Sequence, residues 1–171
     1  SIGMRAPQLS DLSDQLLDNE GENPFYTDPG LNTGESVTGY ISPASVRRAM
    51  HLLHAEDHEF ERIAVALGRF VTETKDWITP DPLSEEEVAS MLVALRRRAR
   101  LQVHGMARIA FDDRNLYVNG RCMALPEEAR PLVAELCSKR QYRGAARTVE
   151  QWQDGLGWML GLGTFEIPEN L

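Results

Sequence analysis

The chain has 171 residues, of which 42% are hydrophobic and 26% are charged, and its formal net charge at pH 7 is −8. These proportions are ordinary for a globular protein and exclude disordered and collagen-like chains, while the apolar runs are too short to cross a membrane. Because affinity for the phosphate backbone of nucleic acid comes mainly from Lys and Arg, the acidic balance also argues against a general nucleic-acid binder.

The distribution of charge and the cysteine content add two expectations. Residues 1–95 carry a net charge of −11 and residues 96–171 a net charge of +3, and this change of sign is the first indication of two modules. Cys122 and Cys137 do not make a disulfide framework or a CxxC metal site. We therefore expect small, mostly buried free thiols and a cytoplasmic protein.

The first 42 residues predict little regular structure. Residues 1–7 have the pattern of a strand end that runs into a proline, and we expect this stub to be frayed or to pair with a neighbouring chain. Residues 8–42 predict a short amphipathic helix and then an irregular linker rich in Gly, Pro, Asn, Ser and Thr.

Residues 43–100 predict three helices. Ser42-Pro43 supplies a capping hydroxyl and a proline at the first helical position. A second helix is expected to begin near Asp57, and a capping box from Ser84 to Glu87 begins the third. We expect these helices to form an antiparallel bundle that serves as a dimerisation domain. The candidates for its core or its dimer interface are Val46, Met50, Leu53, Phe60, Ile63, Leu67 and Phe70.

Residues 101–171 change from helical to strand periodicity and back. Alternation at 107–111 and the apolar residues 116–118 predict two strands, and Asn119-Gly120 predicts a type I′ turn into a third strand at 121–124. After these come a helix that begins at Pro126 and a short helical turn at 141–146. A last helix capped by Thr148 and a closing strand near 164–167 complete the order. This order is typical of a winged-helix domain, so the fold class predicted is mostly α with a small β component.

The four histidines allow an alternative interpretation, in which some of them bind a metal ion. His51, His54 and His58 would share one face of an uninterrupted helix, and His54-Ala55-Glu56 with His104 has the letters of a two-histidine, one-carboxylate iron site. Such a site needs its ligands on rigid strands, whereas the residues around His54 have the pattern of a helix end. We expect surface or half-buried histidines and no metal site.

One basic run stands out, formed by Arg96, Arg97, Arg98 and Arg100. It could contact RNA or an acidic partner, or it could simply complement the dipole at a helix C-terminus. The last predicted helix carries Glu150 and Asp154 and no Lys or Arg, which argues against insertion into the major groove of DNA.

Several segments, taken in order and spacing, resemble the C-terminal half of the bacterial ribosomal oxygenases of the JmjC/cupin type. Residues 1–7 look like the last strand of the catalytic barrel, Phe25-Tyr26-Thr27-Asp28-Pro29 looks like the Tyr-x-Asp-Pro loop, and residues 42–98 are similar to the helical dimerisation domain. The hairpin at 108–120 and the strand at 163–166 are similar to the opening and the close of the winged-helix domain.

The resemblance implies a parent enzyme that uses Fe(II) and 2-oxoglutarate to hydroxylate an arginine of a large-subunit ribosomal protein; related enzymes act on histidine. In the family the iron and 2-oxoglutarate ligands lie upstream of the strand that 1–7 resembles, so we expect no catalytic, cofactor-binding or metal residues in this chain. The resemblance also implies a homodimer. The alternatives are a stand-alone winged-helix DNA-binding regulator and a small structural dimerisation module.

Overall fold

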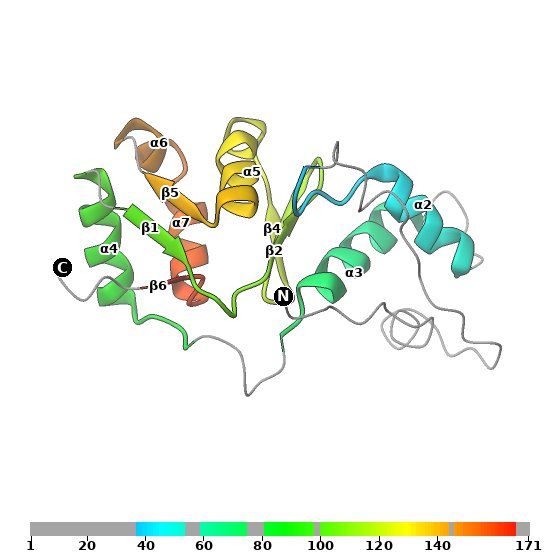
Figure 1. The fold of residues 1–171 in the computed structure, drawn as a ribbon, viewed down its shortest axis with the longest axis horizontal. Helices are drawn as coiled ribbons and strands as arrows, with labels where there is room; N and C mark the ends of the chain where they lie inside the picture. Colours follow the sequence, from blue (N-terminus) through cyan, green and yellow to red (C-terminus); the bar gives the residue numbers. More distant parts are fainter. Residues whose placement is uncertain (1–36, 54–58, 75–80, 98–99, 144–145, 167–171) are drawn as a thin grey trace.

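The computed structural model describes residues 37–53, 59–74, 81–97, 100–143 and 146–166 (Figure 1). The predicted stub at 1–7, the loop at 25–29, His54, His58 and Arg98 lie outside these residues. The described helices are α2 (Pro43–Leu52), α3 (Phe60–Thr72), α4 (Glu85–Arg96), η4 (Glu127–Ala129, a 3₁₀ turn), α5 (Arg130–Lys139), α6 (Ala146–Gln151) and α7 (Gln153–Gly161). The described strands are β1 (Arg100–Val103), β2 (Ile109–Phe111), β3 (Asn115–Val118), β4 (Arg121–Ala124), β5 (Gln141–Arg143) and β6 (Phe165–Glu166). The class predicted from the sequence, mostly α with a small β component, is confirmed.

The predicted helix starts at Ser42 and Ser84 are both present. The Ser42 hydroxyl accepts a hydrogen bond from the backbone N–H of Ser45 at 3.1 Å, and Pro43 occupies the first turn of α2. The Ser84 hydroxyl accepts from the N–H of Glu87 at 3.3 Å, and the Glu87 carboxylate accepts from the N–H of Ser84 at 2.8 Å. Both arms of the capping box therefore satisfy backbone donors that the first turn of α4 would leave unpaired.

A three-stranded antiparallel sheet, in the order β2-β3-β4, lies in the middle of the molecule, with α3 on one side and α5 and α7 on the other (Figure 1). The turn between β3 and β4 has positive φ at Asn119 (48°) and Gly120 (76°), as a type I′ turn requires. Successive residues of β3 point to opposite faces. Leu116 and Val118 belong to the cluster on the α5 and α7 side, and Tyr117 belongs to the cluster on the α3 side. The sheet is therefore buried on both faces.

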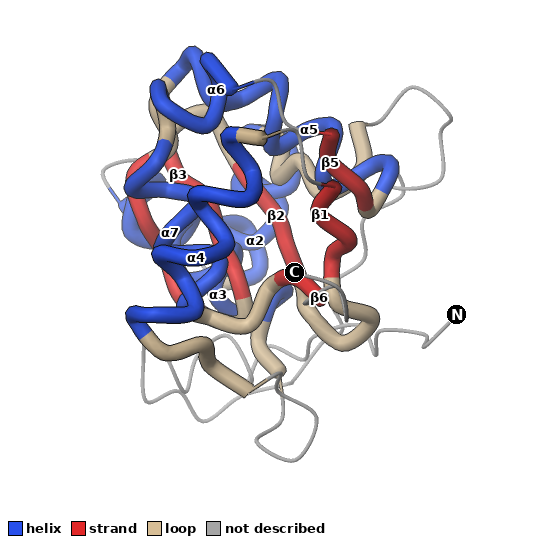
Figure 2. Tube along the Cα trace, turned by 90° about the vertical axis from the view of Figure 1, so that its left-hand side faces the viewer, coloured by secondary structure: helices blue, strands red, loops and turns tan. Residues whose placement is uncertain are grey.

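The helix α4 packs differently from the antiparallel three-helix bundle expected from the sequence. Only α2 and α3 pack against each other, while α4 lies along α7 and α6 on the far side of the sheet (Figure 2). The physical reason is that α3 already has its apolar face covered by the sheet. The apolar side of α4 instead packs on α7, so that a Cβ added at Gly157 of α7 would lie in ordinary van der Waals contact with Leu92 (3.6 Å) and Val88 (3.8 Å).

A second antiparallel sheet has the order β5-β1-β6. The strand β1 has no counterpart in the sequence prediction, and residues 141–143 of the helical turn predicted at 141–146 form the strand β5 instead. Arg140 ends α5 in the left-handed region (φ 54°) and turns the chain into β5. The Arg140 guanidinium donates to the carbonyl oxygens of His104 (2.6 Å) and Ala107 (3.1 Å), which fixes the loop after β1 against the end of α5.

The last predicted helix is divided into α6 and α7 at Trp152. Trp152 has φ −129° and lies outside both helices. A Cβ on Gly155 would come within 2.0 Å of the Trp152 indole, so the ring rests directly on the first turn of α7. Within the described residues, no helix has the length and hydropathy needed to cross a membrane.

Candidate interaction surfaces

The seven apolar candidates of the first two helices lie mainly inside the chain. Five of them, Val46, Met50, Leu53, Ile63 and Leu67, are buried in the cluster between α2, α3 and the central sheet. The other two, Phe60 and Phe70, are half-buried and pack against the edge of that cluster. In this arrangement the five buried side chains form a core, and only the two phenylalanines reach the surface.

The carboxylate of Asp112 is the most highly bonded acidic group among the described residues. Asp112 is buried and accepts hydrogen bonds from the backbone N–H groups of Arg114 and Asn115, each at 2.7 Å, and from the Tyr117 hydroxyl at 2.6 Å. Burial, and then the hydrogen bond to Asp112, raise the pKa of Tyr117 well above its ordinary value. Because the phenol keeps its proton and the carboxylate accepts hydrogen bonds from the β2–β3 turn, these two groups stabilise the turn and do not form an acid–base pair.

The described histidines do not come together. His51 is exposed on α2, whereas His104 is half-buried after β1 and accepts a hydrogen bond at Nδ1 from the N–H of Met106 at 3.2 Å. Within the described ranges no group of three His, Cys, Asp or Glu side chains could hold a metal ion. The side chains that the structure describes therefore do not fit an iron site.

The two cysteines are free, with Cys137 buried and Cys122 half-buried. Burial raises the pKa of the Cys137 thiol to about 12, and it also raises the pKa of Cys122. A thiol whose pKa is raised by burial stays protonated at neutral pH, and the protonated form is a poor nucleophile. Both cysteines therefore act as small apolar side chains.

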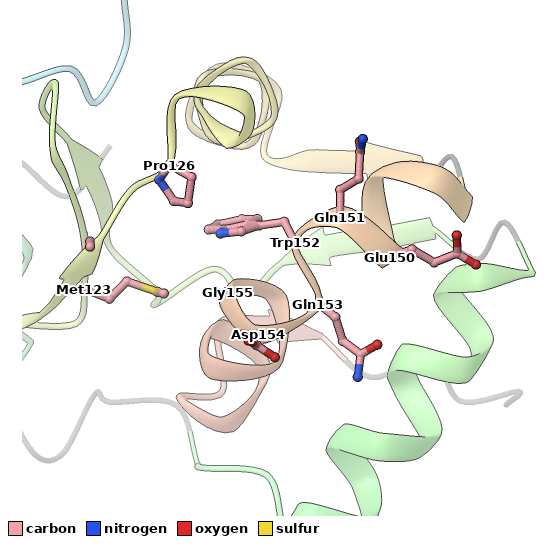
Figure 3. Close-up of a pocket in the computed structure, with 9 residues that line it drawn as sticks. Met123, Pro126, Glu150, Gln151, Trp152, Gln153, Asp154 and Gly155 are labelled. Carbon is pink, nitrogen blue, oxygen red and sulfur yellow. The ribbon is translucent and has the colours of Figure 1, made fainter.

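A shallow cleft of about 270 Å³ lies between the end of β4 and the junction of α6 with α7 (Figure 3). Trp152 projects from the junction toward Pro126 and Met123, and Gly155 lies below it (Figure 3). Glu150 and Asp154 line the same cleft. The volume is close to the lower end of the roughly 300–1,000 Å³ that is typical of small-molecule sites.

The basic run lies where α4 ends and β1 begins. Arg96 is the last residue of α4, Arg97 caps it, and Arg100 opens β1; all three are exposed. Arg96 donates to the side-chain carbonyl of Gln153, and Arg100 donates to that of Gln141. Sequence reasoning finds these arginines but not their glutamine partners, which come from α7 and β5 and are distant along the chain.

Comparison with known proteins gives a likeness of fold. No protein-family model matches the chain, and no curated protein matches it. A crystal structure of the Escherichia coli ribosomal oxygenase YcfD is similar with a TM-score of 0.59 and 17% identity, over 96% of this chain and 47% of that one. This chain has the fold of part of that oxygenase. The resemblance expected from the sequence is thereby confirmed at the level of fold.

Two further structures of the same E. coli protein agree. YcfD in complex with cobalt and succinic acid matches with a TM-score of 0.57 and 19% identity, over 95% of this chain and 47% of that one. YcfD in complex with cobalt and 2-oxoglutarate matches with a TM-score of 0.54 and 20% identity, over 95% of this chain and 46% of that one. The chain thus spans just under half the length of the solved structures it matches.

Proposed function

We propose that this chain is the non-catalytic C-terminal region of a ribosomal oxygenase. Its parent would use Fe(II) and 2-oxoglutarate to hydroxylate an arginine of a large-subunit ribosomal protein. The first described helices would contribute to a homodimer, and residues 101–171 would form a winged-helix part that supports recognition of the substrate. The iron and the 2-oxoglutarate would be bound by the rest of the parent protein.

One observation carries the proposal. The fold agrees over 95–96% of this chain, but it accounts for only 46–47% of the oxygenase in each of the three YcfD structures. A stand-alone regulator would be expected to resemble a small protein over its whole length. Agreement with part of a larger enzyme is what a non-catalytic region of such an enzyme would give. The net charge of −8 also suits a ribosomal protein substrate, because ribosomal proteins are generally basic and attraction between opposite net charges speeds association.

The proposed homodimer would use the outer side of α2 and α3. The five buried candidates already pack within one chain, so a second copy would meet the half-buried Phe60 and Phe70 and the polar residues around them. Light scattering of the purified chain tests this part. A dimeric mass supports it, and a monomer at all concentrations contradicts it.

The test of the enzymatic part compares ribosomal proteins from cells that carry the complete gene with those from cells in which it is deleted. Intact-mass spectrometry should show one oxygen atom more on one large-subunit protein when the gene is present, and fragmentation should place it on an arginine. Identical masses in the two strains would overturn the proposal, and an oxygen on histidine would correct the residue.

The non-catalytic role of this chain has its own control. The purified chain is incubated with Fe(II), 2-oxoglutarate and a peptide of the modified ribosomal protein, and the mass of the peptide is followed. We expect no change. Gain of one oxygen would show that this region catalyses by itself and would contradict the assignment.

A further inference from the structure

Four exposed arginines belong to elements that lie together at one corner of the molecule. The C-terminal end of α4, the start of β1, the end of β5 and the helix α6 lie together there (Figure 1). Their arginines Arg96, Arg97, Arg100 and Arg147 are exposed, and we call this set the arginine corner. The corner stands out in a chain whose net charge is −8.

Among the described residues, the side-chain partners of the arginine corner are neutral amides and not carboxylates. Arg96 and Arg100 donate to the neutral amides of Gln153 and Gln141. Elsewhere the pattern differs, since Arg62 pairs with Glu59 and Arg114 pairs with Glu61. Among the ion pairs formed between described residues, none includes an arginine of the corner.

The helix dipole explains only part of this cluster. Arg96 and Arg97 lie at the end of α4, where a cation is favoured. Arg100 lies on a strand, however, and Arg147 lies in the first turn of α6, where a cation is disfavoured. The dipole of α4 therefore accounts for Arg96 and Arg97 and leaves Arg100 and Arg147 unexplained.

The residue type indicates which anion. All four members are arginines, whose planar guanidinium groups donate pairs of hydrogen bonds to phosphate oxygens. The neighbouring helices α6 and α7 carry Glu150 and Asp154, which oppose insertion of this region into a DNA groove. Structured RNA, in contrast, is recognised largely by its shape and by contacts to its phosphates.

We propose that the arginine corner binds the phosphate backbone of structured RNA without reading its sequence. This inference does not depend on the proposed oxygenase function, because it rests on the placement and the partners of these arginines alone.

The test measures binding of the purified chain to a fluorescent RNA hairpin by anisotropy at several salt concentrations. The variant is the triple substitution R96Q/R97Q/R100Q. The matched control is R62Q/R114Q/R121Q, which removes the same charge from exposed positions on α3, the β2–β3 turn and β4. Circular dichroism and thermal unfolding of both variants confirm that each is folded.

We expect the corner variant to bind at least about tenfold more weakly and the slope of its salt dependence to fall by about one unit for each phosphate that it no longer binds. The control variant should bind within about twofold of the unmodified chain. The proposal is overturned if the chain does not bind RNA at low salt or if both variants weaken binding equally. It is also overturned if a polyglutamate peptide binds as tightly as RNA, which would indicate an acidic protein partner, or if a DNA duplex of equal length does, which would indicate general attraction to polyanions.

Discussion

The ring of Tyr117 on β3 occupies the space directly in front of Gly68 on α3. A Cβ placed on Gly68 would lie 2.3 Å from the Cζ atom of that ring, which is far inside van der Waals contact. Tyr117 is fully buried, and its ring packs between the helix and the sheet. This one close approach sets the distance between α3 and the central sheet.

Gly68→Ala should therefore destabilise the protein. Overpacking in a rigid core costs about 1–3 kcal/mol or more, and this loss exceeds the gain in helix propensity from alanine. The control is Gly161→Ala, because a Cβ at Gly161 meets no atom within 4 Å. Urea unfolding of the two variants measures the difference; equal stabilities would show that Tyr117 can move away without cost.

Tyr117→Phe should cost about 1–3 kcal/mol of unfolding free energy, because it removes a buried hydrogen bond of 2.6 Å to the Asp112 carboxylate. The matched variant is Tyr40→Phe, which removes a solvent-exposed hydrogen bond of 3.0 Å to Asp113 and should cost less than about 1 kcal/mol. Chemical denaturation gives both values. A larger loss in Tyr40→Phe would contradict the view that Asp112 anchors the β2–β3 turn.

Ser84→Ala should lower the unfolding free energy by about 0.5–2 kcal/mol in urea unfolding, as expected for loss of an N-cap.

The hydrogen bonds from Ser84 lower the pKa of Glu87 below its ordinary value of 4.5. The contribution of the Glu87 carboxylate is therefore present above that value and lost as the pH falls through the folded pKa. Glu87→Ala should accordingly lower the melting temperature at neutral pH and have little effect in acid; an equal effect at both would show that its charge is not involved.

The stability should fall on the alkaline side. The Cys137 thiol has a pKa of about 12 in the folded chain, raised by burial from an ordinary value of 9.0, so the unfolded chain releases this proton first. Between those values stability decreases by at most about 1.4 kcal/mol for each pH unit. The raised pKa of Tyr117 acts in the same direction at higher pH. The unfolding free energy measured across this pH range should fall less steeply in Cys137→Ala than in the unmodified chain. An equal slope in the two proteins would show that the Cys137 thiol does not cause the decline.

The packing of α4 against α6 and α7 predicts two contrasting alanine substitutions on one helix. Leu95 is fully buried, and Leu95→Ala should cost about 2–5 kcal/mol. Val93, at 48% exposure, faces solvent, and Val93→Ala should change stability by no more than about 0.5 kcal/mol. The ranking is measured by thermal or urea unfolding, and its reversal would mean that α4 presents its other side to the core.

The elements that the sequence predicts well are those whose signals lie within a few residues. The Ser42 cap, the capping box from Ser84 to Glu87 and the turn at Asn119-Gly120 are each determined by local hydrogen bonds or by backbone sterics. All three are present in the structure. Propensity and side-chain spacing are sufficient in these places because no distant residue has to take part.

The features that the sequence does not predict depend on distant partners. The strand β1 exists because Leu101 pairs with Tyr142 and Val103 pairs with Phe165, which are far along the chain. The packing of α4 on α7 likewise brings together residues that are distant along the chain, such as Leu92 and Gly157. The sequence shows most of the arginine corner as a basic run, but the setting of these arginines among neutral amides follows from the packing of α4, β1, β5 and α7. No periodicity carries that information.

The alternation of β3 between two clusters has a consequence for cooperativity. Tyr117 completes the apolar cluster beneath α2 and α3, while Leu116 and Val118 belong to the cluster beneath α4, α5 and α7. A single strand of four residues therefore contributes side chains to both clusters. Neither cluster can lose β3 without opening the other, so the described residues should unfold in one transition. A chain cut after residue 100 would separate α2 and α3 from the sheet that covers them and would remove α4 from its place beside α7.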